Sequence, residues 1–405
     1  MKVLILGGGG REHALAWKIS QSSLCSKVFA SPGNPGIARL ATCLPAPGAG
    51  AADFFRLAED LDADLTIVGP EAPLVAGVVD EFRARGRRII GPAAAAAQLE
   101  GSKVFSKHFL QRAGIPTAQF ITAEDSRAAR PVIGRYGYPV VLKADGLAAG
   151  KGVIIAQDEG EALAALARLP AGRLVIEECL RGEEVSFIAF TDGTRIVPLP
   201  ATQDHKAVGD NDTGPNTGGM GAYCDGRILT EERSRVVMET IIFPTLDRMR
   251  AEGAPFTGFL YAGLMMTAEG PKVLEFNVRL GDPEAQALIH RMDSDLIAVL
   301  LGDENPRWKA DPSVCVVLAA EGYPGAVRTG DTIHGVDACG ATAFHSGTSI
   351  GPKGLATAGG RVLGVTSAGP DLSQAIANTY AAVERIQFDG MHYRRDIGRK
   401  GLKRW

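Results

Sequence analysis

The sequence predicts a multidomain protein that combines the α/β and α+β fold classes in three successive units. Short apolar runs alternate with helical patterns up to about residue 100, hairpin-like strand patterns follow, and a further set of strands begins near residue 311. The chain has 405 residues, enough for two to four domains that each bury a core. We therefore place the units at residues 1–100, 101–310 and 311–405.

Composition and charge exclude several classes of protein. Apolar residues make up 45% of the chain and charged residues 22%, which is typical of a globular protein and not of a disordered or collagen-like one. The net charge of -3 gives no overall attraction to nucleic acid or to a membrane, so we expect neither as a partner. The six cysteines occur singly, without zinc-site spacing, and no signal-peptide pattern precedes the first strand-like run. We expect reduced thiols and a cytoplasmic location.

The first unit is predicted to be Rossmann-like. Apolar runs at Val3–Leu6, Leu65–Val68 and Arg88–Ile90, separated by helical patterns, are typical of a parallel sheet. The glycine run Gly7–Gly10 follows the first strand and opens a helix, so its amides could approach a phosphate. Because Glu12 stands where a dinucleotide fingerprint has its third glycine, NAD binding is disfavoured. A phosphosugar site and a ligand-free tight turn both stay open.

A second glycine-rich segment, Lys143–Val153, lies between two strand patterns of the second unit. It is not a Walker A loop, because Asp145 and Gly152 stand where that motif needs Gly and Ser or Thr. We interpret it as a hairpin flap that closes over phosphates, with a plain turn as the alternative. The candidate nucleotide contacts in this segment are Lys143, Gly146, Gly150 and Lys151.

Two lysines are candidate phosphate ligands. Lys143 ends an apolar strand, where a lysine needs an anionic partner, and a triphosphate would supply one. Lys103, at the start of the predicted helix Lys103–Ala113, is a second candidate; a solvated helix residue is its alternative.

The run Leu174–Leu180 predicts a strand that ends in an acidic linker. Main-chain groups around Glu178, Cys179 and Leu180 could meet the edge of an adenine ring, and Glu184 could accept hydrogen bonds from ribose hydroxyls. A solvent-exposed acidic turn is the alternative.

The segment Leu274–Arg279 alternates apolar and polar residues, which places Glu275, Asn277 and Arg279 on one face of a strand and Leu274 in the core. Glu275 and Asn277 offer hard oxygens for Mg²⁺, and Arg279 can stabilise a moving phosphoryl group. A polar outer sheet face is the alternative. The flap, the linker and this strand occur in the order that the ATP-grasp fold requires, so together they predict ATP binding.

The remaining segments complete the predicted layout. Gly209–Gly221 is expected to be a long loop, followed by a helix over Glu231–Arg250. The third unit begins with the apolar run Val314–Ala320 and ends with a helix over Leu372–Ile386. We interpret the basic tail Arg394–Arg404 as a solvated chain end.

Eight segments, in order, resemble the family of phosphoribosylamine–glycine ligases, also called glycinamide ribonucleotide synthetases, and the likeness runs nearly from end to end. The segments are GGGGREHALAW (7–17), PGNPG (32–36), VGPEAPLVAG (68–77), KADGLAAGKGV (143–153), QDHK (203–206), GPNTGGMGAY (214–223), LEFNVRLGDPEAQ (274–286) and GGRVLGVT (359–366).

This resemblance implies a fold and a reaction. The fold would be an ATP-grasp core with a lid near residues 115–190, preceded by a Rossmann-like domain and followed by a small barrel-sandwich-like β domain. The reactants would be ATP, glycine and 5-phosphoribosylamine, with Mg²⁺ or Mn²⁺, and the enzyme would be a monomer or weak homodimer. An ATP-grasp ligase that uses formate or bicarbonate is the alternative enzyme, and a catalytically silent nucleotide-binding regulator the alternative outside enzymes.

The resemblance also implies roles for individual residues. It places Asp204, Lys206, Asp212 and Asn216 around glycine and the transferred phosphate, with Asp204, Asp212 and Arg279 as catalytic residues. It places Gly9, Glu71 and Asp282 at the amino sugar and Lys353 and Arg361 at its phosphate. Gly263 stands where a first metal carboxylate is expected, so metal binding would depend on Glu275 and Asn277.

Overall fold

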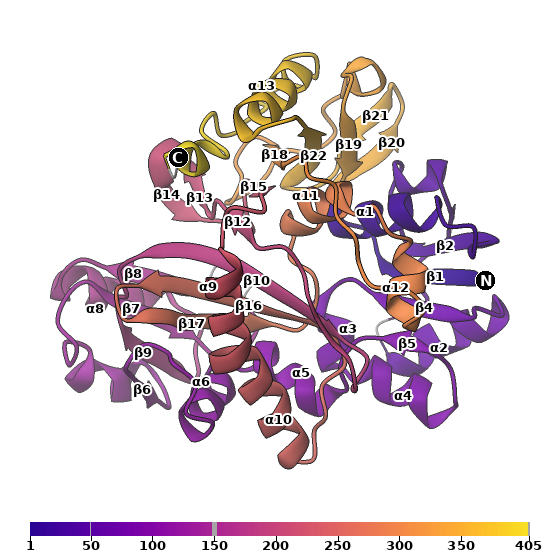
Figure 1. Cartoon of the computed structure of the whole chain (residues 1–405). Coiled ribbons are helices and arrows are strands. Elements are labelled where there is room, and N and C mark those ends of the chain that lie inside the picture. The colour runs from indigo at the N-terminus through magenta and orange to yellow at the C-terminus, as the bar shows by residue number, and fades with distance from the viewer. Residues whose placement is uncertain (49, 148–151, 404–405) are drawn as a thin grey trace.

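The computed structural model describes residues 1–48, 50–147 and 152–403. Figure 1 shows an N-terminal sheet on one side, a smaller lobe on the other, and the C-terminal strands and helix above both. A long antiparallel sheet connects these parts. None of the described helices has the length and apolar composition needed to span a bilayer.

The N-terminal sheet is parallel and has the strand order β3-β2-β1-β4-β5, which confirms the Rossmann-like prediction. Its central strands are almost completely buried, because helices cover both faces and each strand is a continuous apolar run. The strands are β1 (Lys2–Gly7), β2 (Lys27–Pro32), β3 (Thr42–Cys43), β4 (Leu65–Val68) and β5 (Ile89–Ile90), and the helices are α1 (Gly10–Ile19), α2 (Ala51–Asp60), α3 (Glu71–Val75) and α4 (Val78–Ala84). Two further helices, α5 (Ala94–Gly101) and α6 (Lys103–Arg112), lead out of this region.

The smaller lobe is a four-stranded antiparallel sheet with its own hydrophobic core. The order is β6-β9-β7-β8, and α7 (Ser126–Ala129) and α8 (Glu159–Arg168) pack against it. The strands are β6 (Phe120–Ala123), β7 (Val140–Ala144), β8 (Val153–Ala156) and β9 (Leu174–Glu178), so the hairpin-like strands read from the sequence are confirmed. The separate core allows this lobe to be an independent packing unit.

The nine-stranded sheet runs from the centre of the molecule into its C-terminal part without interruption. Its main path is β17-β16-β10-β12-β15-β18-β22-β19, with β11 paired to β10. β15 belongs to the second predicted unit and β18 to the third, and the two pair directly, Ala222 opposite Cys315. The strands are β10 (Glu183–Thr191), β11 (Ile196–Pro198), β12 (Thr202–Asp204), β15 (Gly221–Cys224), β16 (Gly258–Thr267), β17 (Gly270–Asn277), β18 (Ser313–Ala319), β19 (Thr342–His345) and β22 (Arg361–Ala368).

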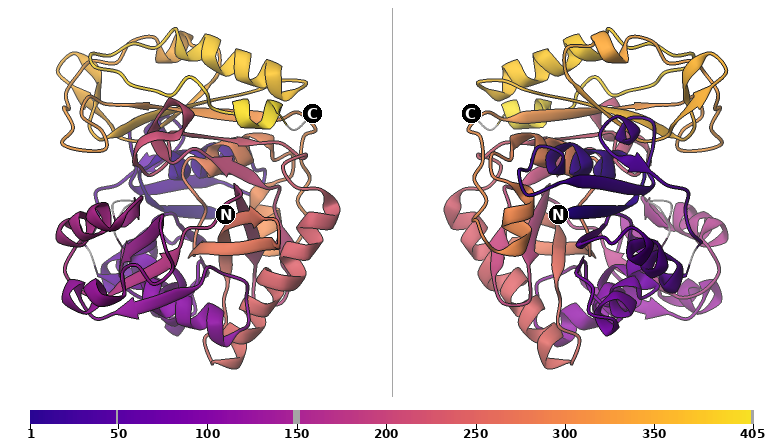
Figure 2. Two further views of the ribbon diagram at one scale, coloured as in Figure 1. Left: turned by 90° about the vertical axis from the view of Figure 1, so that its left-hand side faces the viewer. Right: turned by 90° about the vertical axis from the view of Figure 1, so that its right-hand side faces the viewer.

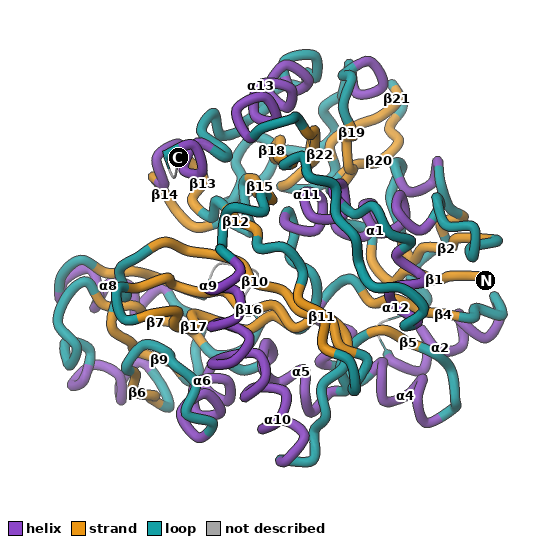
Figure 3. The backbone as a smooth tube through the Cα atoms, viewed as in Figure 1, coloured by secondary structure: helices purple, strands orange, loops and turns teal. Residues whose placement is uncertain are grey.

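The structure departs from the expected layout in two places, and Figure 3 shows the first of them, the short strands β13 and β14. The Gly209–Gly221 segment was expected to be a loop, but it contributes to a short hairpin of β13 (Ala207–Gly209) and β14 (Thr213–Asn216). The helix expected over 231–250 is divided into α9 (Glu231–Val237), a π-helical turn over Met238–Ile242, and α10 (Phe243–Ala251). Pro244 is the second residue of α10, two positions after the π turn, and a proline removes one helical N–H donor, which accounts for the irregularity.

The C-terminal part lies across the top of the molecule, over both of the other regions (Figure 2). Helix α13 (Leu372–Val383) packs against β18 and β22, and the hairpin of β20 (Thr348–Gly351) and β21 (Gly354–Thr357) extends from it. Helix α11 (Glu284–Arg291) packs against β18 and β22 of this part and against α1, α12 (Leu296–Leu301) contacts α1, and α14 (Arg399–Leu402) is the last helix of the described chain. The basic tail is not simply solvated as predicted, because Arg394 is completely buried.

Candidate active site

Strand β17 presents Glu275 and Asn277 at a partly accessible face, as predicted, but its alternation is interrupted. The pairing with β16 shifts register at this point: Gly263 pairs with Glu275 and Leu264 with Val273, so Leu274 is the extra residue of a β-bulge in β17. The bulge leaves Leu274 only half-buried and puts Val273 in the core, so the predicted core position of Leu274 is wrong. A β-carbon at Gly263 would lie 3.2 Å from Glu275 Cγ, so little space remains for a second carboxylate there.

Positive charge surrounds Glu275. Lys206 Nζ lies 3.2 Å from Glu275 Oε1 and 3.4 Å from Glu184 Oε2. Lys206, and more weakly Lys143 and Lys103, outweigh the effect of burial and lower the pKa of Glu275 to about 2. Glu275 is therefore a carboxylate at neutral pH, and three lysines surround it that a polyanion could also contact.

Lys143 has a protein partner that the sequence reading did not find. Its ammonium group forms an ion pair with Glu177 and donates a hydrogen bond to the Leu274 carbonyl at 3.0 Å. Lys107 Nζ contacts the other Glu177 oxygen at 2.8 Å, so one carboxylate holds two lysines. All three side chains are at least nine-tenths buried. A triphosphate is therefore not needed to compensate the charge of Lys143. The same lysine also lowers the pKa of Glu275.

The base of the glycine flap is anchored to the start of α6. Lys103 Nζ donates to the Gly146 carbonyl at 2.8 Å, and Asp145 accepts from Ser102 Oγ at 2.9 Å and from the Val104 amide at 3.2 Å. Gly146 has φ +87°, a backbone conformation that favours glycine. The candidates Gly150 and Lys151 lie outside the described residues.

The acidic linker connects β9 to β10, as predicted. Glu178 is bound within the smaller lobe by two hydrogen bonds to Gln119. Its amide donates to the Gln119 carbonyl at 3.1 Å, and its carboxylate accepts from the Gln119 amide at 2.9 Å. Cys179 and Leu180 follow β9 and are half-buried. Glu184 is exposed at the start of β10, and the contact with Lys206 brings it to the Glu275 cluster.

Arg279 connects β17 to the N-terminal region. Its guanidinium donates to Glu100 at 2.7 Å and to Asn277 Oδ1 at 3.3 Å, and its Nε lies 3.5 Å from Glu71 Oε2. Burial opposes its charge, but Glu100 and Glu71 raise its pKa, so it stays a cation. Nε is buried and makes no hydrogen bond among the described residues. Glu100, which sequence reasoning missed, is the strongest protein partner of this cation.

The glycine loop meets Asp282. The Gly9 amide donates to Glu12 Oε2 at 2.6 Å and the Arg11 amide lies 3.4 Å from Asp282 Oδ2. The Gly9 amide, which the sequence left open for a phosphate, is therefore taken by the protein's own Glu12 carboxylate. A β-carbon at Gly9 would lie 2.8 Å from Glu12 Oε2 and 3.4 Å from Asp282 Oδ2, so a side chain here would displace the Glu12 carboxylate.

Arg361 lies on the other side of Asp282. One of its nitrogens donates to the Asp282 and Gly218 carbonyls at 2.5 Å and lies 3.5 Å from Asp282 Oδ1. Burial lowers the pKa of Arg361, but Asp282 and other acids more than offset this and raise it. The loop after β17, the C-terminal strand β22 and the central Gly218–Gly219 turn thus meet at one point.

A buried polar network separates the Glu275 cluster from the Asp282 cluster. Tyr261 donates to Glu284 Oε1 at 2.8 Å, and Ser186 Oγ lies 3.2 Å from the same oxygen. Burial, followed by the nearby Glu284 carboxylate, raises the pKa of Asp204 well above its ordinary value. Asp204 can therefore hold a proton at a pH where ordinary aspartates cannot. Glu284 is a further residue that sequence reasoning missed.

Three candidates make their contacts elsewhere. Asp212 forms ion pairs with Arg394 at 3.1 Å and Lys400 at 2.6 Å. Asn216 ends β14 and pairs with Ala207 in the hairpin. Lys353 is exposed in the turn between β20 and β21, with no ion pair to any other described residue.

The fold and these two adjoining charged clusters define an ATP-grasp ligase. Residues 101–285 match the ATP-grasp (A) domain of phosphoribosylglycinamide synthetase, residues 1–100 its N domain and residues 313–400 its C domain. The chain therefore belongs to the phosphoribosylglycinamide synthetase family.

Individual relatives agree with this assignment. The phosphoribosylamine–glycine ligase of Escherichia coli K12 is 49% identical over 427 residues, which span 100% of this chain and 99% of that protein. The crystal structure of the Thermotoga maritima phosphoribosylamine–glycine ligase has a TM-score of 0.85 at 34% identity and covers 98% of this chain and 100% of that one. N5-carboxyaminoimidazole ribonucleotide synthetase from the same organism shares the fold, with a TM-score of 0.66 at 18% identity over 96% of this chain and 99% of that one.

Proposed function

We propose that the protein joins glycine to 5-phosphoribosylamine at the expense of ATP, giving glycinamide ribonucleotide, ADP and phosphate in purine biosynthesis. The observation that carries this proposal is the segment from Glu275 to Asp282. At one end of this segment Glu275 pairs with Lys206, and at the other end Asp282 lies 3.5 Å from Arg361. We infer that the first end faces the nucleotide and the second the acceptor substrate. A ligase that activates one substrate with ATP and delivers it to another needs two such adjoining sites.

The reaction divides into two balanced transfers. A glycine carboxylate oxygen attacks the γ-phosphorus of ATP, the bond to the β-phosphate oxygen breaks, and ADP leaves. The amine of phosphoribosylamine then attacks the carbonyl of glycyl phosphate, phosphate leaves with the bonding electrons, and the nitrogen loses one proton. Neither step requires a protein nucleophile, so positioning and charge stabilisation supply the catalysis.

On the nucleotide side, Lys143 and Lys103 are proposed to bind phosphates together with Gly146, Gly150 and Lys151 of the flap. Main-chain groups near Glu178, Cys179 and Leu180 are proposed to meet the adenine, and Glu184 the ribose. The support is the presence of three lysines around Glu275 and the hydrogen bond from Lys103 to the Gly146 carbonyl in the flap.

Glu275 and Asn277 are proposed to hold Mg²⁺ or Mn²⁺, and their oxygens fit this role because Glu275 is ionised and both lie on one strand face. No group of three or more His, Cys, Asp or Glu side chains placed to hold a metal occurs in the described part of the chain, so the remaining ligands would come from nucleotide phosphates and water. The metal would neutralise charge on the triphosphate.

On the acceptor side, Gly9, Glu71 and Asp282 are proposed to bind the amino sugar, and Arg361 and Lys353 its phosphate. Lys206 and Asn216 are proposed to contact glycine, with Arg279 stabilising the transferred phosphoryl group. Asp204 is proposed to accept the amine proton, because its raised pKa makes it a stronger base than an ordinary aspartate. Asp212 is better supported in a different role, given below.

The test is release of phosphate and ADP with each substrate omitted in turn. We expect turnover only when ATP, glycine, phosphoribosylamine and a divalent cation are all present. Turnover with formate or bicarbonate in place of glycine would identify a different ATP-grasp ligase. ADP release that needs no amino acid would contradict the proposal altogether.

A further inference from the structure

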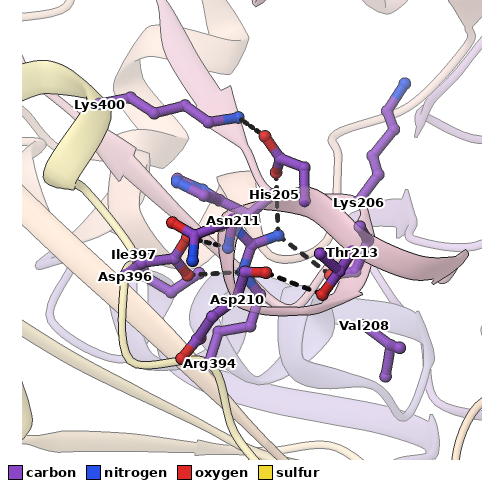
Figure 4. Close-up of polar contacts among 12 residues, drawn as sticks. His205, Lys206, Val208, Asp210, Asn211, Thr213, Arg394, Asp396, Ile397 and Lys400 are labelled. Atoms are coloured by element: carbon purple, nitrogen blue, oxygen red, sulfur yellow. Dashed lines mark hydrogen bonds and ion pairs between the residues drawn. The ribbon is translucent and has the colours of Figure 1, made fainter.

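The C-terminal segment holds the β13–β14 hairpin at several points along its length. The Asn211 amide donates to Asp396 Oδ2 at 2.9 Å, and the Arg395 amide to Asp210 Oδ1 at 2.7 Å. The His392 ring nitrogen lies 2.9 Å from the Val208 carbonyl. Segments almost 200 residues apart in sequence are thus joined across the hairpin, as Figure 4 shows.

Arg394 is the centre of these contacts. Its side chain has no exposed surface, and one nitrogen donates to both the Ala207 carbonyl and Asp212 Oδ1 at 3.1 Å. Its other donors form a two-bond pair with Asp396, both at 2.7 Å. Burial opposes the charge of Arg394, but Asp396 and Asp212 raise its pKa. A buried guanidinium with this many partners fixes a geometry that a lysine could match only in part.

The β13–β14 hairpin, to which Arg394 hydrogen-bonds, contains a strained turn that contacts from outside the hairpin stabilise. Asn211 and Asp212 both have positive φ angles, 57° and 59°, which cost free energy for residues other than glycine. Their amide and carboxylate are the groups that Asp396, Arg394 and Lys400 bind. The C-terminal contacts therefore stabilise a turn that would otherwise relax.

Lys206 stands at the base of the same hairpin, directly before Ala207. Its carbonyl accepts from the Thr217 amide and hydroxyl, both at 2.8 Å, which closes the hairpin. Its side chain extends away from the Arg394 cluster (Figure 4) and reaches Glu275 and Glu184. Whatever holds the backbone at Ala207 consequently limits where the Lys206 ammonium group can lie.

We propose that Arg394 is a positioning residue: by binding Ala207 and Asp212 it holds the β13–β14 hairpin so that Lys206 stays against Glu275. Asp212 serves this clamp rather than the chemistry. The effect on activity rests on the proposed function of Lys206, while the effect on the hairpin does not. The C-terminal segment thereby contributes to the nucleotide-side cluster without touching it.

The first experiment measures the hairpin itself. Amide hydrogen exchange over residues 207–217 is compared in the wild type, Arg394→Ala and Arg394→Lys, with Arg395→Ala as the matched control. Arg395 is the exposed neighbour whose guanidinium lies over Tyr393, and the hydrogen bond from its backbone N–H to Asp210 survives substitution of the side chain. We expect faster exchange in Arg394→Ala, partial recovery in Arg394→Lys and wild-type exchange in Arg395→Ala. Unchanged exchange in Arg394→Ala would overturn the proposal, whether or not the enzyme uses glycine.

The second experiment asks whether Arg394 acts through Lys206. We expect Arg394→Ala to lower kcat about tenfold or more, the usual scale for removing a supporting partner, and to change the KM for phosphoribosylamine little. In a Lys206→Ala background the same substitution should lower kcat less than about twofold, because the group it positions is gone. A full additional tenfold loss in the double variant would show that Arg394 acts by another route and would refute the proposal.

A second clamp variant covers the case in which Arg394→Ala fails to fold. Asp212→Ala removes the carboxylate that Arg394 and Lys400 share, at a position that is exposed on one side. It should reproduce both the faster exchange and the non-additivity with Lys206→Ala. A loss of kcat in Asp212→Ala with wild-type exchange would instead return Asp212 to a direct catalytic role and contradict the clamp.

Discussion

Lys206 and Glu275 form an ion pair, with Nζ 3.2 Å from Oε1, between the strand region β12–β13 and strand β17. The pair sets the charge state of both groups. Glu275 and Glu184 raise the pKa of Lys206 well above its ordinary value against the effect of burial, and Lys206 lowers that of Glu275 to about 2. Both groups are consequently charged at neutral pH.

Glu275→Gln is expected to lower turnover by roughly 100-fold or more, the scale of losing one stabilising group at a reaction centre. The substitution keeps the shape but removes the charge that Lys206, Lys143 and Lys103 face. Turnover should recover in part at raised Mg²⁺, which phosphate release across a Mg²⁺ titration measures. Glu269→Gln, at an exposed ion pair with Lys272, is the control and should behave as the wild type. Near-normal activity of Glu275→Gln at ordinary Mg²⁺ would contradict the metal assignment.

Arg361→Ala is expected to raise the KM for phosphoribosylamine by at least tenfold, with a smaller effect on the KM for ATP and glycine. The reason is location: Arg361 contacts Asp282 and the Gly218 carbonyl on the acceptor side, away from the lysines around Glu275. A charge-assisted bond to a phosphate is worth more than 1.4 kcal/mol, about a tenfold change. Initial rates with each substrate varied in turn provide the measurement. Arg328→Ala, an exposed arginine paired with Asp331, is the control, and equal KM changes for all three substrates would refute the assignment.

The parts of the fold that local patterns determine could be predicted from the sequence. Continuous apolar runs predicted the strands of the parallel sheet, and period-two alternation placed Glu275 and Asn277 on one face of a strand. The bulge that displaced Leu274 could not be predicted, because it depends on how β16 pairs with β17 rather than on β17 alone. The β13–β14 hairpin was missed because its short strands carry no apolar pattern.

The partners of the site residues were beyond sequence reasoning for a related reason. Glu177 reads as a polar position in a strand, and only the packing of α6 against β9 shows that it holds Lys107 and Lys143. Arg394 sits in a basic tail, and charged tails are usually solvated. Its burial follows from contacts with a hairpin that lies almost 200 residues earlier. A buried ion pair of this kind can be recognised only from the three-dimensional positions of both partners.

Glu177→Gln is expected to destabilise the protein by about 3 to 5 kcal/mol, since it leaves two buried lysines without their shared carboxylate. Burial alone would raise the pKa of Glu177, but Lys143 and Lys107 more than offset this and lower it. A lowered folded-state pKa contributes stability that is complete above the ordinary carboxyl pKa of about 4.3 and is lost as pH falls through the folded-state value.

The difference in unfolding free energy between the wild type and Glu177→Gln should therefore be constant from neutral pH down to about 5 and should narrow below about 4.3. Urea denaturation across that range measures it. Glu239→Gln, at an exposed pair with Arg235, is the control and should cost no more than about 1 kcal/mol. A difference that grows on acidification would have the wrong sign for this ion-pair network.

His13 is expected to make the protein less stable as pH falls from about 6.5 to about 4. Its Nδ1 accepts the His345 amide at 2.7 Å, which joins α1 to strand β19 and requires that nitrogen to be unprotonated. Burial, with His345 and Arg39 nearby, lowers the pKa of His13 to about 3.

Between that value and the ordinary histidine pKa the unfolded chain binds one more proton than the folded chain, so the free energy of unfolding falls on acidification by up to about 1.4 kcal/mol per pH unit. His13→Asn keeps an acceptor for the His345 amide but cannot titrate, so urea denaturation at several pH values should show a shallower slope. A slope equal to that of the wild type would show that this contact does not control the acid stability of the joined N-terminal and C-terminal parts.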